Sequence, residues 1–256
     1  MPQLRRPLPR RLDHEEEASL VEHLTELRTR ILISLGSVVG WFVVTFVFRE
    51  TIIGWLSRPL DGEKPITLSP AEPLTTSFNV SLWAALALSM PVIIWQAWAF
   101  LAPAFAPRNQ QTVVRMVAVA TLLLALGMAF AYWVVLPTSI HFLQNFDAEL
   151  YNIEIRAREY YGFAAVMIFT VGLIFELPIF VVGLVSLGVL SSDTLRRNRR
   201  VGYGLCIVAA VLLPGTDPAS MALQALPVVA LFELSIWASV FFERRAAAAE
   251  PPAGET

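Results

Sequence analysis

Long apolar stretches alternate along the chain with short polar segments. Six stretches carry few or no charged side chains, and most are long enough to cross a bilayer, because about 20 helical residues span a hydrocarbon core of ~30 Å. The pattern predicts membrane-spanning helices at 31–48, 74–106, 116–143, 160–190, 201–213 and 219–242. Since the fifth stretch reaches only about 20 Å, we expect it to form a short hairpin with the sixth.

The residues just before the first span have a different period. Leu20, Leu24 and Leu27 fall on one face of a helix, and Glu22 and Glu26 fall on the opposite face. The spacing predicts an amphipathic helix that leads directly into the membrane.

Composition agrees with a membrane protein, since 56% of the 256 residues are hydrophobic, 16% are charged and the mean hydropathy is +0.60. The first 19 residues are different, because four arginines, three prolines and an acidic run cannot bury a core. We therefore expect disordered tails at 1–19 and 243–256 and one membrane domain at 20–242. The predicted fold class is an all-α polytopic membrane protein.

The distribution of basic residues predicts the orientation. Counted over alternate polar segments, 14 Lys and Arg residues lie on the side of the two termini and 5 lie on the other side. The positive-inside rule therefore places both termini in the cytoplasm. The outer segments 49–73 and 144–159 hold enough apolar residues to form caps at the membrane interface.

Catalysis is not indicated by the candidate residues. His14 and His23 lie near the N-terminus, whereas His141 is expected near the opposite face, so a histidine metal site is not predicted. Cys206 is the single cysteine, which excludes an intramolecular disulfide, and no nucleophilic serine motif occurs. We expect no enzymatic activity, no metal and no cofactor.

Two carboxylates lie inside apolar stretches, Glu176 two residues before Pro178 and Glu233 in the last span. A charge in hydrocarbon is costly, so each should face the bundle interior or a water-filled groove. Each residue is either a structural group bonded across helices or a functional group, namely a proton relay or a docking point for another polypeptide.

Short motifs occur in a defined order along the chain. They are EHLTELRTR at 22–30, SRPL at 57–60, SPAE at 69–72, WQAWAFLAP at 95–103, FAY at 130–132, FELP at 175–178, Asp217, and FE at 232–233. In this order and with this hydropathy, the chain resembles the TatC family, the receptor subunit of the twin-arginine protein translocase.

The resemblance implies six helices packed as a concave, glove-like wall in a bacterial-type inner membrane. It also implies binding of the Arg-Arg motif of signal peptides, and export of folded proteins on the proton-motive force. The implied partners are single-span TatA/TatB-type subunits in a multimeric complex. A proton-coupled secondary transporter of a small solute is the alternative, suggested by Glu176 and by the proline-interrupted helices.

The resemblance assigns residues to two groups. A carboxylate suits an arginine pair because a bidentate contact distinguishes Arg from Lys by geometry. The signal-peptide residues are Glu26, Arg28, Phe100, Pro103 and Asn109. The residues expected in transport or partner docking are Pro59, Glu72, Tyr132, Glu176, Asp217 and Gln224.

The chain departs from the family pattern at two positions. Asn109 stands where the family usually has a second glutamate, so Glu26 supplies the only formal negative charge of that pair. Met221 stands at a position where the family has Gln, and Gln224 follows one turn later on nearly the same helix face.

Overall fold

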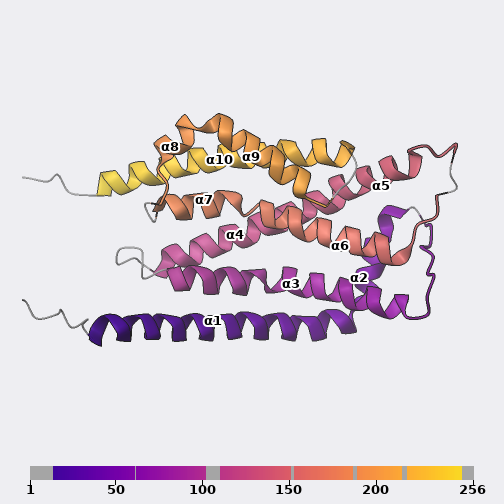
Figure 1. Ribbon diagram of the computed structural model, residues 1–256, viewed down its shortest axis with the longest axis horizontal. Coiled ribbons are helices and arrows are strands. Elements are labelled where there is room, and N and C mark those ends of the chain that lie inside the picture. Colours follow the sequence, from indigo (N-terminus) through magenta and orange to yellow (C-terminus); the bar gives the residue numbers. More distant parts are fainter. Residues whose placement is uncertain are drawn as a thin grey trace, which may run out of the picture.

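The computed structural model describes residues 14–60, 62–101, 110–150, 153–186, 189–214 and 218–249. Within these ranges every regular element is a helix, apart from an isolated bridge between Ile66 and Arg156. The long helices lie side by side in one bundle (Figure 1). This confirms the prediction of an all-α fold.

Helix bounds follow the apolar stretches closely. The elements are α1 (His14–Val47), α2 (Arg49–Leu56), η1 (Arg58–Leu60), α3 (Glu72–Leu101), α4 (Gln110–Phe130), η3 (Ala131–Val135), α5 (Leu136–Asn145), α6 (Ala157–Ile174), α7 (Leu177–Ser186), α8 (Ser192–Arg197), α9 (Arg199–Leu212) and α10 (Pro218–Ala249).

Five helical segments of the described chain are long and apolar enough to cross a membrane, two of them formed by successive elements joined end to end. The predicted fifth span, 201–213, corresponds to α9, which has 14 residues and is therefore about 21 Å long. Length and composition thus support five of the six predicted spans, and α9 is as short as the sequence indicated.

Chain direction defines two ends of the bundle (Figure 1). We call the end at which α1 begins and α10 ends the terminal end. The opposite end, with α2 and the first residues of α3 and α6, is called the distal end. The start and the finish of the described chain therefore lie on one side of the bundle.

Helices extend into both segments that we expected to be tails. α1 begins at His14, inside 1–19, and α10 continues to Ala249, inside 243–256. Acidic residues favour a first helical turn and alanines favour a last one, which explains both extensions. The end of the predicted second span, 102–106, lies outside the described residues.

Two of the long passes are interrupted next to a proline. A π-helical turn, Ala131–Val135, joins α4 to α5 just before Pro137, and α6 ends at a turn before Pro178. Proline lacks the N–H of the helical ladder, so the preceding backbone rearranges. In contrast, α3 continues as a helix through Pro91.

Close helix packing surrounds α6, whose buried side chains form the largest apolar cluster together with η3 and the end of α2. At Gly127 on α4, an added Cβ would lie 2.6 Å from the Phe175 side chain. At Gly172 on α6, it would lie 2.6 Å from Met128. The two glycines therefore allow α4 and the α6–α7 break to approach closely.

Candidate functional site

An ion pair joins Glu26 and Arg30, one turn apart on α1 at the terminal end. Arg30 Nε lies 3.0 Å from Glu26 Oε1, and Arg30 Nη2 donates to the same oxygen. Arg30 Nη1 also donates to Gln96 Oε1 on α3, at 3.3 Å. The Glu26 side chain is 37% exposed, so the pair can be reached from solvent.

An aromatic contact lies beside this ion pair. The rings of His23 and Phe100 are stacked with their centroids 4.4 Å apart. Among the predicted signal-peptide residues, Glu26 and Phe100 therefore meet at one junction of α1 and α3, and Arg28 is exposed on α1. Pro103 and Asn109 lie outside the described residues.

The junction can bind a cation. Both hydrogen bonds from Arg30 to Glu26 end on Oε1, and the other carboxylate oxygen, Oε2, has no hydrogen bond from any described residue. A guanidinium or ammonium group arriving from solvent could therefore bind Oε2 while Arg30 stays in place.

Glu72 lies at the distal end, remote from this junction, and only 3% of the residue is exposed. Its carboxylate accepts from Arg156 Nε at 3.0 Å and Nη2 at 3.3 Å, and from the backbone N–H groups of Leu68 at 3.0 Å and Arg158 at 3.2 Å. The hydrogen bond to Glu72 raises the pKa of Arg156 above its ordinary value. Glu72 thus holds segments 49–73 and 144–159 together beside the Ile66–Arg156 bridge.

Three tyrosines bind the end of α2 at the distal end. Tyr132, on η3, is the predicted member of this group, and Pro59 follows directly in η1. The contacts are Tyr132 Oη to Trp55 O at 2.8 Å, Tyr160 Oη to Leu56 O at 2.6 Å, and Tyr161 Oη with Ser57 Oγ at 2.7 Å. The π-helical turn thereby places Tyr132 where it supports α2.

Glu176 lies in the turn between α6 and α7, well inside the fourth pass. Its Oε1 is buried and has no hydrogen-bond partner in the described part of the chain. A buried carboxyl oxygen without a partner is uncommon, because lost hydration is then not replaced. Glu176 is thus part of the turn that interrupts the helix before Pro178.

Glu233 has partners across the final hairpin. It accepts a hydrogen bond from Tyr203 on α9 and lies 3.5 Å from Arg199 Nη2. The structure therefore supports the interpretation of Glu233 as a structural group bonded between helices.

Gln224 does not present its amide on the surface of the described chain, and its assignment to transport or partner docking stays a prediction. The residue is 1% exposed, and its Nε2 donates to Pro214 O at 3.4 Å across the α9–α10 turn. Its position on α10 turns it inward, where it holds the hairpin. Asp217 lies outside the described residues.

The polar partners of Glu26 and Glu72 were not identified from the sequence. Arg30 had a signal, because its spacing of four residues from Glu26 predicts a contact on one helix. Gln96 and Arg156 had none, because each meets its partner through the packing of distant segments.

A comparison with known proteins identifies the family of this chain. The family model described as Sec-independent protein translocase protein (TatC) matches residues 22–227. The chain belongs to the TatC family.

Relatives and solved structures agree with this membership. The TatC protein of Deinococcus radiodurans is 36% identical over 88% of this chain and 87% of its own length. The Escherichia coli K12 TatC protein is 33% identical over 89% and 90%, respectively. A crystal structure of the twin arginine translocase receptor TatC in DDM has a TM-score of 0.75 and 29% identity, covering 84% of this chain and 98% of that one.

Membership of the TatC family confirms the identification made from the motifs. The chain is a multi-pass membrane protein of a Sec-independent protein translocase, so its role lies in protein transport within a translocase complex. The small-solute transporter is not favoured by these similarities.

Proposed function

We propose that this TatC protein binds twin-arginine signal peptides at the junction of α1 and α3, with Glu26 as the principal acceptor. The observation that carries the proposal is the Glu26–Arg30–Gln96 arrangement, which already holds one guanidinium at a solvent-accessible carboxylate. The similar crystal structures are described as those of the twin arginine translocase receptor, which also supports it.

The arginine preference follows from the geometry of the acceptor. A planar guanidinium can donate two hydrogen bonds to Glu26 Oε2, as Arg30 does to Oε1, whereas the ammonium group of lysine binds as a point charge. Phe100, stacked on His23 beside the pair, adds an apolar wall that reduces access of water to the contact.

The bound peptide belongs to cargo that then crosses the membrane folded. In this proposal six helices, including the short α9, form a concave wall with both termini in the cytoplasm. Single-span TatA/TatB-type subunits join the complex after the peptide binds, and the proton-motive force drives transport. The basic-residue asymmetry of 14 to 5 supports this orientation, because it predicts the terminal end on the cytoplasmic side.

A peptide-binding assay tests the proposal. The full chain in nanodiscs is titrated with an Arg-Arg signal peptide and with its Lys-Lys counterpart. We expect the parent protein to prefer the Arg-Arg peptide by about tenfold, the effect of roughly one charge-assisted hydrogen bond. Glu26→Gln should remove most of this preference.

Glu50→Gln is the matched control, because Glu50 is an exposed glutamate on α2 at the distal end. It should leave both affinities unchanged. If Glu26→Gln binds the Arg-Arg peptide as well as the parent does, the assignment of the site is wrong.

A further inference from the structure

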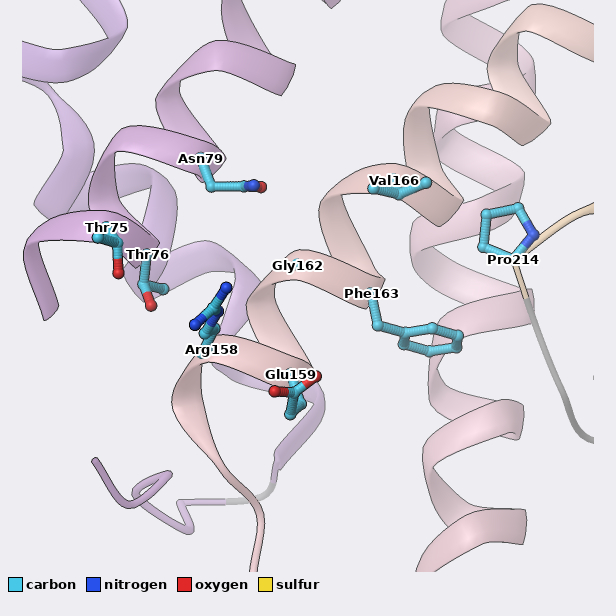
Figure 2. Close-up of a pocket in the computed structure, with 9 residues that line it drawn as sticks. All are labelled: Thr75, Thr76, Asn79, Arg158, Glu159, Gly162, Phe163, Val166 and Pro214. Atoms are coloured by element: carbon cyan, nitrogen blue, oxygen red, sulfur yellow. The ribbon is translucent and has the colours of Figure 1, made fainter. Parts of the chain in front are cut away.

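A cavity of about 440 Å³ lies at the distal end between the first turns of α3 and α6. It is far along the bundle from Glu26 and has no part in the signal-peptide site proposed above. Its lining residues are Thr75, Thr76, Asn79, Arg158, Glu159, Gly162, Phe163, Val166 and Pro214 (Figure 2).

Three hydrogen-bond donors of the lining lack a partner among the described residues. Thr76 is 5% exposed and its Oγ1 is buried without a hydrogen bond. Neither the Asn79 amide nor the Arg158 guanidinium is paired within the described chain, although the backbone N–H of Arg158 binds Glu72. Since buried polar groups are normally satisfied, the Thr76 hydroxyl indicates a missing acceptor. The Asn79 and Arg158 side chains are exposed and can donate to the same acceptor.

The donors come from both walls of the cavity. Thr76 and Asn79 are three residues apart and so share one face of α3, and Arg158 lies in the first turn of α6. Figure 2 shows the Arg158 side chain on the side of α6 that faces these α3 residues. An acceptor with several oxygens, such as a phosphate, matches this arrangement.

Polarity changes along the depth of the cavity. The donors occupy the first two turns of α3 and the first turn of α6, nearest the distal end. Phe163 and Val166 lie one to two turns farther along α6, toward the middle of the membrane domain, and Pro214 adds another apolar surface. A ligand that fills this space has a polar head and an apolar chain.

One acidic residue restricts the head group further. Glu159 lines the cavity next to Arg158, and its carboxylate lies 3.5 Å from Arg156 Nη1. Arg158 attracts a phosphate, and the Glu159 carboxylate beside it attracts an ammonium group, so a ligand that carries both charges next to each other matches this lining.

We propose that the cavity binds a phospholipid whose head group carries a phosphate next to an ammonium group, as in phosphatidylethanolamine. The phosphate accepts from Arg158, Thr76 and Asn79, the ammonium group lies near Glu159, and an acyl chain follows the apolar wall. The proposal does not depend on signal-peptide binding at Glu26.

Native mass spectrometry of the full chain, freed of lipid in detergent, tests the proposal by titration with defined lipids. We expect phosphatidylethanolamine to bind more tightly than phosphatidylglycerol. Arg158→Gln should weaken that binding about tenfold, which corresponds to one charge-assisted contact. Arg58→Gln is the matched control, because Arg58 is an exposed arginine in η1 that does not line the cavity.

Further measurements test the roles of Thr76, Glu159 and the acyl chain separately. Thr76→Val removes an unpaired buried hydroxyl, so it should weaken lipid binding without lowering the melting temperature of the lipid-free protein. Glu159→Gln should abolish the preference for phosphatidylethanolamine. Soluble phosphoethanolamine should bind far more weakly than the lipid, because it lacks the acyl chain.

Three results would overturn the proposal. They are equal lipid binding by Arg158→Gln and Arg58→Gln, tighter binding of phosphatidylglycerol than of phosphatidylethanolamine by the parent, and binding of soluble phosphoethanolamine as tight as that of the lipid.

Discussion

Arg30 binds Glu26 on its own helix and Gln96 on α3 at the same time. The carboxylate that we propose for a signal arginine is therefore already paired with an arginine of the protein. This contact orients the Glu26 side chain, but it also places a positive charge where a positively charged peptide would arrive. Arg30 therefore orients the Glu26 carboxylate and also competes with the peptide for it.

Removing Arg30 should strengthen peptide binding. Arg30→Gln keeps a hydrogen-bonding side chain but removes the competing charge, so we expect the Arg-Arg peptide to bind roughly two- to fivefold more tightly, since a partly exposed ion pair is worth at most about 1 kcal/mol. Peptide titration of the protein in nanodiscs measures the change.

The double variant Glu26→Gln with Arg30→Gln is the control, and it should show no gain over Glu26→Gln alone. Weaker binding by Arg30→Gln would mean that Arg30 contacts the peptide itself, which contradicts the competing role.

Glu176 should act after the signal peptide has bound. It lies at the α6–α7 turn, deep in the fourth pass, and its Oε1 has no partner among the described residues. Glu176→Leu should leave peptide affinity unchanged and raise the melting temperature, because an unsatisfied buried group is removed. Transport of a folded reporter protein into inverted vesicles should fall strongly.

The control for Glu176 is Glu233→Gln, since Glu233 has partners across the final hairpin. That variant should lower the melting temperature instead. Full transport activity of Glu176→Leu would show that Glu176 is at most a structural residue.

Hydropathy alone predicted most of the helices, because a bilayer requires continuous apolar segments whatever their neighbours are. The interruption before Pro178 and the short α9 follow from local chemistry and length in the same way. The Glu26–Arg30 contact is also local, since it depends only on a spacing of four residues on one helix.

Contacts between distant segments could not be predicted in this way. The Glu72–Arg156 pair joins residues 84 positions apart, and no local pattern brings their segments together. The burial of Gln224 could not be predicted for a related reason, because α10 is largely apolar around its circumference and its sequence therefore does not indicate which face points inward.

Gly127 should tolerate no side chain, because an added Cβ would lie 2.6 Å from the Phe175 side chain. Gly127→Ala should destabilise the protein by about 1–3 kcal/mol, as expected for overpacking at a close helix contact. Thermal unfolding in detergent measures the effect.

Gly36→Ala on α1 is the matched control, since nothing lies within 4 Å of the added Cβ there. It should be neutral or slightly stabilising, because alanine favours helix more than glycine does. Equal stability of both variants would contradict the close packing of α4 on the α6–α7 turn.

Accessibility to a membrane-impermeant thiol reagent should differ between the two ends of the bundle. In a Cys206→Ser background, Lys64→Cys at the distal end should be labelled from outside the cell, and Asn198→Cys, between α8 and α9, only after the membrane is opened. The expectation rests on the basic-residue asymmetry. Labelling of both positions from the same side would contradict six crossings with cytoplasmic termini.

Asn109 is the position at which a second carboxylate should improve the signal-peptide site. Hydrogen bonds between charged groups are worth about 1.5–3 kcal/mol, against about 1 kcal/mol for neutral ones, and Asn109 offers only a neutral amide. Asn109→Glu should therefore tighten Arg-Arg peptide binding about tenfold and make it more sensitive to salt. Affinities measured at low and high ionic strength would show both changes.

The neighbouring Arg108 provides an independent check of this electrostatic argument. Arg108→Ala removes a like charge and should strengthen binding modestly, most clearly at low salt, whereas Asn109→Gln keeps a neutral amide and should change nothing. If Asn109→Glu and Asn109→Gln bind the peptide equally well, the second position does not contact the arginine pair. Glu26, held by Arg30, would then be its sole charged acceptor in the proposed site.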